Sequence, residues 1–89
     1  MMNANEAKKM TNEVREAEMQ KTREAARELC ENVIGKRIEC AAQNGYNTTE
    51  HAYDKYIYDE KFIEAVKQYL ENRGYKVYRQ SVRVIAIKW

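Results

Sequence analysis

Residues 59–89, DEKFIEAVKQYLENRG followed by YKVYRQSVRVIAIKW, decide the fold because they contain one recognisable helix and one recognisable β-hairpin. Asp59 is a favourable N-cap, and Glu60 stands in the first turn, where the helix dipole stabilises an acidic side chain. Gly74 is a typical helix stop. Apolar residues recur between these ends on one helical face: Phe62, Ile63, Val66, Tyr69 and Leu70. The sequence therefore predicts a helix over residues 59–74.

The C-terminal segments, residues 75–79 and 82–89, are rich in β-branched and aromatic side chains, which indicates a hairpin. We expect Gln80 and Ser81 to form the turn, although they match a type I′ turn poorly and the loop could be longer. Three cross-strand pairs follow from this register: Val77 with Val84, Tyr75 with Ala86, and Tyr78 with Arg83. The core face then holds Val77 and Val84, and the other face holds Tyr78, Arg83, Ile85, Ile87 and Trp89.

The N-terminal half, residues 5–44, consists almost entirely of good helix formers and predicts a long helix. Its apolar pattern changes midway. A thin first stripe comprises Ala7, Met10, Val14 and Ala17, and the same frame continues into Lys21, Glu24, Glu28 and Glu31. A wider second stripe, out of phase with the first, comprises Ala26, Leu29, Cys30, Val33, Ile34, Ile38, Ala41 and Ala42. We expect a helical arm over residues 1–21 and one small domain over residues 22–89.

Gly35 lies within the second stripe and indicates either a break in the helix or the close approach of another backbone segment. Asn44 and Gly45 should end the helix. Residues 46–58 mix turn-forming residues with tyrosines, and we expect a short strand within them. If that strand and the hairpin are parallel neighbours, the helix between them makes a right-handed crossover. The fold class is α+β: a long N-terminal helix, a short strand, a second helix and a C-terminal β-hairpin in two layers.

Length and composition limit the classes of function that the protein can have. The chain has 89 residues, enough for one domain, and its net charge of +2 does not demand a nucleic acid or an anionic membrane as partner. It contains no apolar run near the roughly 20 residues needed to cross a bilayer, and no membrane partner is expected. Its first ten residues lack the apolar core of an export signal. We therefore expect the protein in a cytoplasm.

The side chains most often used in catalysis or metal binding are few. Cys30 and Cys40 are about 15 Å apart along one helix, too far for a disulfide, and are expected to be small buried apolar side chains. His51 is the only histidine, and its spacing from nearby carboxylates matches no known site, so a solvated loop histidine is the favoured interpretation. No phosphate-binding glycine loop is present. We expect no enzyme activity, no cofactor and no metal.

Charge is unevenly distributed along the chain. Residues 46–60 carry four acidic side chains against one lysine, whereas residues 72–89 carry five basic side chains and no acidic one. Basic and aromatic side chains together on a sheet are typical of surfaces that bind nucleic acid. The candidate residues are Arg73, Lys76, Tyr78, Arg79, Arg83 and Lys88. Alternatively, these Lys and Arg side chains protect an exposed sheet edge from pairing with another strand, and we favour this interpretation.

Tyrosine and the apolar residues of the arm indicate a protein-binding surface instead. Tyrosine is enriched in protein interfaces, and four of the seven tyrosines fall within residues 46–58. The arm needs a cover, which its own domain, a partner or another copy of the chain could supply. The candidate contact residues are Tyr46, Tyr53, Tyr56, Tyr58, Met10 and Val14. Tyrosines that fill the periphery of a small core remain an equal alternative.

Three segments carry a resemblance: residues 38–45 (IECAAQNG), residues 69–77 (YLENRGYKV) and residues 87–89 (IKW). Over residues 22–89 they resemble small uncharacterised accessory proteins of tailed bacteriophages, in which a Gly-stopped helix precedes a second helix, a Gly-Tyr-x-Val strand and a hydrophobic final strand. The resemblance implies a phage origin, and with it the host cytoplasm and a small accessory role in the virion or against the host. It implies no catalytic residues, and the arm lies outside it.

The sequence therefore predicts a small non-enzymatic phage accessory protein that acts by binding protein and forms a homo-oligomer. A domain of about 68 residues without its arm has a marginal core, for which association is a common remedy. A host-factor inhibitor and a virion component are equally compatible with this expectation. The alternative is a nucleic-acid-binding module that uses the basic C-terminal hairpin.

Overall fold

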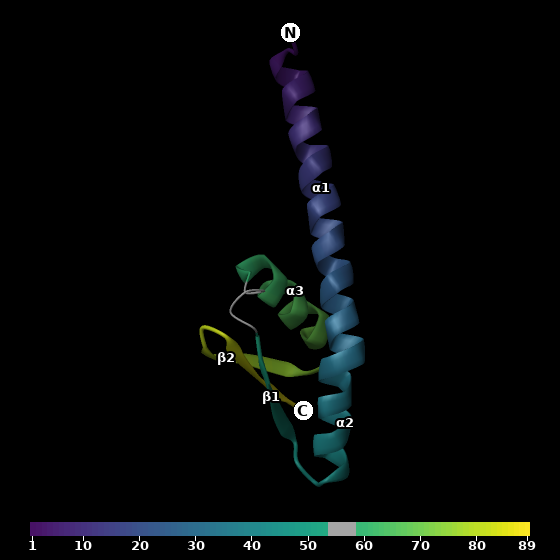
Figure 1. Cartoon of the computed structure of the whole chain (residues 1–89), viewed down its shortest axis with the longest axis vertical. Helices are drawn as coiled ribbons and strands as arrows, with labels where there is room; N and C mark the ends of the chain where they lie inside the picture. The colour runs from purple at the N-terminus through teal and green to yellow at the C-terminus, as the bar shows by residue number, and fades with distance from the viewer. Residues whose placement is uncertain (54–58) are drawn as a thin grey trace.

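The computed structural model describes residues 1–53 and 59–89. A second helix and three strands lie beside the lower part of a long N-terminal helix (Figure 1). The elements in chain order are α1 (Ala4–Leu29), the π-helical turn η1 (Cys30–Ile34), α2 (Gly35–Gln43), β1 (Thr48–Ala52), α3 (Glu60–Glu71), β2 (Lys76–Ser81) and β3 (Val84–Lys88). This order confirms the predicted α+β class.

Side-chain caps fix where α1 and α3 begin. The Asn3 side chain accepts a hydrogen bond from the Glu6 N–H at 2.9 Å and donates one to the Glu6 carboxylate at 2.9 Å, so Asn3 is the N-cap of α1. The Asp59 carboxylate accepts a hydrogen bond from the Lys61 N–H at 3.0 Å. The predicted N-cap at Asp59 is therefore confirmed.

Two glycines end the helices as predicted. Gly45 has φ of 83° and Gly74 has φ of 91°, a left-handed conformation that glycine adopts without strain. Immediately after each glycine the chain folds back, and the Tyr46 N–H donates to the Ala41 carbonyl at 2.9 Å while the Tyr75 N–H donates to the Leu70 carbonyl at 3.2 Å. Both helix ends are therefore Schellman motifs, in which backbone N–H groups satisfy the last helical carbonyls.

The long helix does not break at Gly35. It passes instead through η1, and a Cβ at position 35 would lie 3.0 Å from the Cys30 carbonyl oxygen, so the close contact is with the same helix and not with another backbone segment as predicted. The extra residue of a π-helical turn resets the helix phase. Residues spaced four apart drift by about 40° per step in a uniform α-helix. The reset keeps one set of such residues buried: Ala26, Cys30, Ile34 and Ile38.

The sheet is antiparallel at each of its ladders, in the order β1-β3-β2. β1 is the short strand expected within residues 46–58. β1 and β2 run in the same direction, but β3 lies between them, so they are not the parallel neighbours on which the predicted crossover depended. The C-terminal strand therefore occupies the centre of the sheet and pairs with both edges.

The hairpin register differs from the predicted one. Val82 and Arg83 form the turn, Gln80 lies at a register irregularity, and Val77 pairs with Ile87 instead of Val84. Tyr78 pairs with Ala86 and not with Arg83, and Tyr75 lies outside the β2–β3 ladder that was expected to pair it with Ala86. Because side chains alternate along a strand, this shift puts Ile85 (2% exposed) and Ile87 (0%) on the core face. The predicted core role of Val84 is wrong, since Val84 is only half-buried and pairs with Ala52 on the opposite face.

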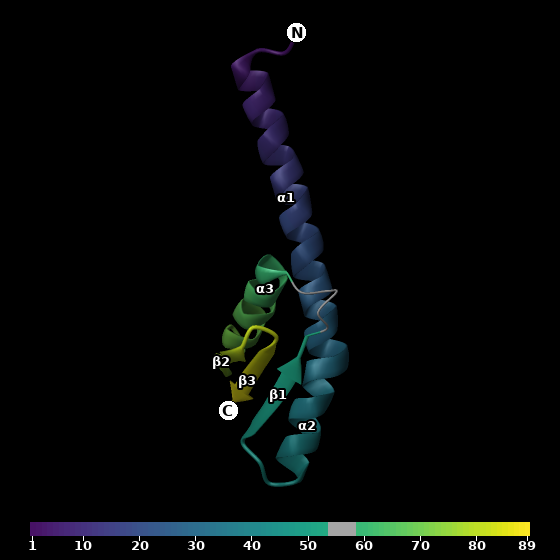
Figure 2. The same ribbon diagram turned by 60° about the vertical axis from the view of Figure 1, so that its left-hand side comes forward.

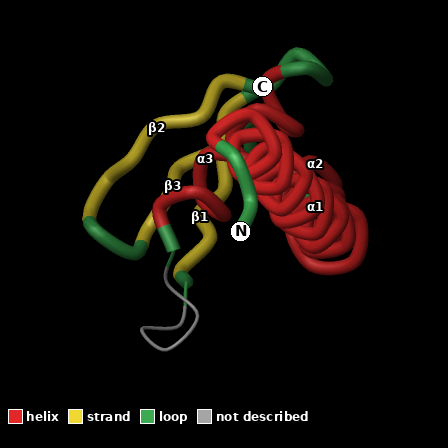
Figure 3. The backbone as a smooth tube through the Cα atoms, turned by 90° about the horizontal axis from the view of Figure 1, so that it is seen from above, coloured by secondary structure: helices red, strands yellow, loops and turns green. Residues whose placement is uncertain are grey.

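The core lies between the sheet and the helices. Viewed along the long axis, the strands lie on one side and the helices on the other, which confirms the two predicted layers (Figure 3). Val33 (38% exposed) and Ala42 (exposed), both predicted to belong to the core stripe, lie outside the core. The buried apolar cluster comprises Ala26, Cys30, Ile34, Ile38, Tyr53, Ile63, Val66, Leu70, Val77, Ile85 and Ile87.

Candidate protein-binding surface on the arm

The arm (residues 1–21) projects beyond the body (residues 22–89), as Figures 1 and 2 show from two directions. Every residue of the arm is exposed, and the first buried side chain in the chain is Ala26. The radius of gyration is 16.6 Å, against about 12 Å for a compact domain of this length, and the longest extent is 62 Å. The arm is therefore a helix without cover from the described part of its own chain.

One face of the arm carries apolar side chains, which we call the arm stripe (Ala7, Met10, Val14 and Ala17). Met10 is 53% exposed and Val14 is 52% exposed. They line a shallow hollow of about 470 Å³ together with Met2, Ala7, Thr11 and Arg15. The arm stripe is therefore a continuous apolar surface open to solvent.

The arm stripe points away from the face by which the lower part of the same helix packs on α3. Successive residues of an α-helix are about 100° apart around the axis. Ala26 is 1% exposed and marks the face of α1 that packs on α3 and the core. From Ala26, Val14 is about 120° and Met10 about 160° around the helix. Packing against the body therefore cannot cover the arm stripe while α1 stays helical.

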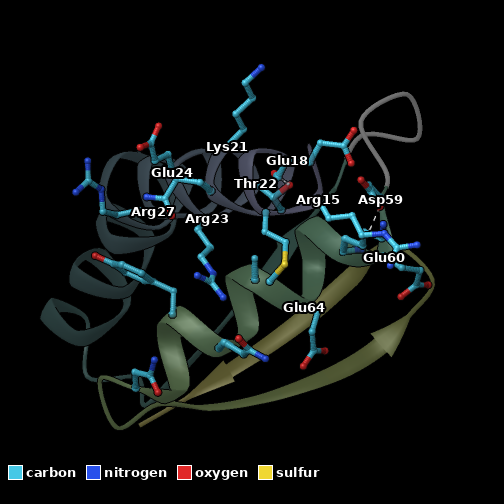
Figure 4. A pocket seen from close by; sticks show the side chains of 17 residues that line it. Arg15, Glu18, Lys21, Thr22, Arg23, Glu24, Arg27, Asp59, Glu60 and Glu64 are labelled. Atoms are coloured by element: carbon cyan, nitrogen blue, oxygen red, sulfur yellow. Dashed lines mark hydrogen bonds between the residues drawn. The ribbon is translucent and has the colours of Figure 1, made fainter. Parts of the chain in front are cut away.

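A groove of about 1250 Å³ runs between the lower part of α1 and α3 on the other side of the helix. Figure 4 shows the side chains that line it: Arg15 of α1 lies on the side of Asp59 and Glu60, whereas Lys21 and Glu24 point away from α3. The α1 wall carries four basic side chains against two acidic ones, and the α3 wall carries three acidic side chains against one basic one. The opposite net charges of the two sets of lining residues cancel and leave the groove without net charge for an ionic ligand.

The predicted tyrosine surface does not form as a unit among the described residues. Tyr46 is 65% exposed at the end of α2, whereas Tyr53 is 6% exposed in the core. Tyr53 packs edge to face on Phe62 with ring centroids 6.1 Å apart, so it offers no surface to a partner. Tyr56 and Tyr58 lie outside the described residues. Tyr46 is therefore the one predicted tyrosine contact that the described structure places on the surface.

His51 is buried, contrary to the expected solvated position. It lies on the core-facing side of β1, 7% exposed, with its ring 4.9 Å from the Tyr53 ring. His51 Nδ1 and the Tyr53 hydroxyl have no hydrogen-bond partner among the described residues. Burial, with a further contribution from the Arg37 charge, lowers the pKa of His51, and burial raises the pKa of Tyr53. His51 is therefore neutral and structural at neutral pH.

The two cysteines differ in environment. Cys30 is buried, as expected, and burial raises its pKa to about 11, which leaves little of the reactive thiolate at neutral pH. Cys40 is exposed, so the prediction that it is buried is wrong. Residue 40 lies on the α2 face turned away from Ile38, which is the side chain that packs in the core. Among residues 1–53 and 59–89, no group of three His, Cys, Asp or Glu side chains could hold a metal ion.

The basic residues of the C-terminal segment are divided between different surfaces. Arg79 makes two hydrogen bonds to the Glu60 carboxylate, at 2.6 and 2.8 Å, on the helix-facing side of the sheet. The Arg73 guanidinium lies 3.6 Å from the centre of the Tyr69 ring on α3. Arg83 lies in the β2–β3 turn. The outer face of the sheet holds the remaining candidates: Lys76, Tyr78 and Lys88.

None of the helices in the described part of the chain is long and apolar enough to cross a membrane. No protein family, no curated protein and no solved structure matches this chain.

Proposed function

We propose that this protein acts by binding protein and that it self-associates through the arm stripe. The observation that carries the proposal is an α-helical arm whose apolar face is exposed and turned away from the body. Most helical stability in proteins comes from the packing of an apolar face, and the arm has no such packing from the described part of its own chain. A second copy supplies the same apolar face and closes the interface by two-fold symmetry.

The expected strength of this association is modest. Burying an exposed Met or Val completely contributes about 1.5–3 kcal/mol, and Met10 and Val14 are each about half exposed in the single chain. Their burial in both copies therefore contributes on the order of 4 kcal/mol, before the smaller contribution of the alanines and the entropic cost of association. Because about 4 kcal/mol corresponds to a dissociation constant near 1 mM, we expect a weak dimer that forms at about 1 mM and above.

Sedimentation equilibrium of the full chain with one matched pair of variants tests the proposal. Met10 and Met19 are exposed to 53% and 51% on the same helix, but they lie about 180° apart around its axis. Met10→Glu should abolish the dimer because it places a charge in the arm stripe. Met19→Glu makes the same chemical change on the opposite face and should leave the dimer intact. A monomeric mass for the unmodified chain at every concentration, or equal effects of both substitutions, would remove the basis for the proposal.

We further propose binding in place of catalysis, and an accessory role of the kind that the bacteriophage resemblance implies, in the host cytoplasm. The buried thiol with a raised pKa and the buried neutral histidine support binding, since neither is exposed and poised for chemistry at neutral pH. A host protein bound by the dimer and a neighbouring virion protein are both consistent with this role. Co-purification of the protein with assembled particles would support the virion role, and its absence from particles would support the host-directed one.

Nucleic acid binding is the second candidate function. The observation that favours it is a cluster on the outer face of the sheet, where the Lys88 ammonium lies 5.6 Å from the Tyr78 ring and Lys76 pairs with Lys88 across the strands. Fluorescence anisotropy with single-stranded RNA or DNA at low and high salt tests it. Salt-sensitive binding that is lost in a Lys76→Ala, Lys88→Ala variant would support this function, and no binding at low salt would exclude it.

A further inference from the structure

The charge pattern of α1 beyond the arm indicates how two arms can pair. The frame of the arm stripe continues along the helix into Lys21, Glu24 and Glu28, which lie on the same face as Met10 and Val14. We propose that the two arms pair antiparallel, with the two-fold axis crossing the seam at the level of residue 12 along the helix. This inference rests on the proposed self-association and specifies its geometry.

A parallel pair is disfavoured by like charges. In a parallel two-fold pair each residue of the seam faces the same residue of the second copy. Lys21 would face Lys21, Glu24 would face Glu24 and Glu28 would face Glu28 over the two turns that follow the arm stripe. Like charges held opposite each other on neighbouring helices destabilise the pair. The same three residues therefore oppose a parallel arrangement along the part of α1 that is packed on the body.

An antiparallel pair avoids these contacts. With the axis at the level of residue 12, the numbers of residues that lie at the same level in the two copies add up to 24, so Ala7 faces Ala17 of the second copy and Met10 faces Val14 of the second copy. Ala4, the first helical residue, then lies level with Gln20, and Lys21 faces Asn3 at the end of the partner helix. Glu24 and Glu28 extend past the second copy into solvent. The overlap therefore covers residues 4–20, all of which are exposed in the single chain.

The body does not obstruct this pairing. Packing against α3 uses the face marked by Ala26, about 120° from Val14 and 160° from Met10. Each body therefore projects away from the seam, one at each end of the paired arms. The one like-charge contact that the register creates is between the two copies of Glu13, which lies beside the seam near the axis.

The separation of the two copies of Cys40 distinguishes the orientations. Cys40 is exposed and Cys30 is buried with a pKa raised to about 11, so a thiol-directed spin label reacts at Cys40 in the natural sequence. Residue 40 is 28 residues from the axis, which places the two labels about 84 Å apart along the helices in the antiparallel pair. In a parallel pair the labels lie at the same level. Pulsed electron–electron double resonance on the full chain should therefore detect no short Cys40 distance.

A second label gives the positive signal. In an Asn5→Cys, Cys40→Ala variant, the labels of an antiparallel pair are about 21 Å apart along the axis, and a short distance should appear. A short distance at Cys40 in a dimeric sample would overturn the antiparallel geometry while leaving self-association intact. A dimer by sedimentation with no short distance at either site would place the interface outside the arm and overturn both proposals. A monomer by sedimentation would refute self-association itself.

Discussion

The arm and the first turns of the body belong to one continuous helix, yet they are stabilised in different ways. Both are built from good helix formers. In the arm Met10 is 53% exposed, whereas Ala26 is 1% exposed and Ile34 is fully buried in the body. Helix propensity is thus similar on both sides, and burial is not. The comparison shows that the helical pattern alone does not reveal whether a face is covered by the same chain or by another.

Fixed polar contacts also distinguish the two regions. In the body the Tyr69 hydroxyl donates to the Glu31 carboxylate at 2.8 Å and the Arg37 guanidinium donates to the Glu50 carbonyl at 3.4 Å, which ties the long helix to α3 and to β1. In the arm the side-chain hydrogen bonds among the described residues are local to the helix: Thr11 donates to the Ala7 carbonyl, and Asn3 and Glu6 form the cap. The arm should therefore respond to concentration, and the body to substitutions in its core.

The largest expected effect is on the body, at the hairpin register. Ile85→Asp should unfold the body, because a carboxylate buried without a partner at a position 2% exposed costs several kcal/mol. Val84→Asp is the matched control, one residue away on the other face, and should change stability by less than about 1 kcal/mol. Urea unfolding followed by circular dichroism measures both. If Val84→Asp destabilised the body more than Ile85→Asp, the register with Val84 in the core would be the correct one.

A smaller effect is expected at the π-helical turn η1, which sets the phase of the long helix. Gly35→Ala places a Cβ 3.0 Å from the Cys30 carbonyl oxygen and should destabilise the body by about 1 kcal/mol, although alanine is the better helix former. Asn32→Ala, at an exposed position of the same π-helical turn, should be neutral or slightly stabilising. Urea unfolding compares them. If Gly35→Ala were the stabilising variant, the close contact would not constrain the turn.

The pH dependence of the body should be traceable to His51. Because burial lowers the pKa of His51 in the folded state, the unfolded chain takes up the proton first as the pH falls below about 6.5. The free energy of unfolding should therefore be highest above this pH and decrease below it. Thermal melting of the natural chain and of His51→Gln between pH 7.5 and pH 5 compares the two slopes. Equal slopes would show that His51 does not contribute.

The smallest expected effect is on the arm. Glu13→Gln removes the like-charge contact at the proposed axis and should strengthen the dimer by a few tenths of a kcal/mol, about the size of other helix charge pairs. Added salt should strengthen the natural dimer in the same direction by screening. Sedimentation equilibrium at two salt concentrations measures both effects. Weaker association of the Glu13→Gln variant would mean that Glu13 contacts a basic group and that the register is different.

Much of the fold could be predicted because the relevant signals are local. The cap at Asp59 and the stops at Gly45 and Gly74 each depend on a few adjacent residues, and the structure has them where the sequence predicts them. The arm stripe was likewise visible as a spacing of apolar residues. Whether a second copy covers the arm stripe stays a prediction, since a single sequence does not show which partner a surface binds.

The register and the burial of single residues could not be predicted with the same success. Val82 and Arg83 form the turn although β-branched valine favours strands, so propensity misplaced the turn by two residues. The extra residue at the register irregularity near Gln80, which the sequence did not predict, then reversed the faces of Val84 and Ile85. His51 and Tyr53 are buried because β1 packs beside the central strand β3, a contact between segments more than 30 residues apart. Such long-range pairing leaves no local signal in a single sequence.

Amide hydrogen exchange at several protein concentrations tests the central claim most directly, because it compares the arm and the body in one experiment. If a second copy covers the arm stripe, protection of amides in residues 4–21 should rise with concentration between about 0.1 mM and several mM. Protection in the body, at residues such as Ile34 and Ile87, should stay constant over the same range. Arm protection that does not change with concentration would contradict self-association through the arm.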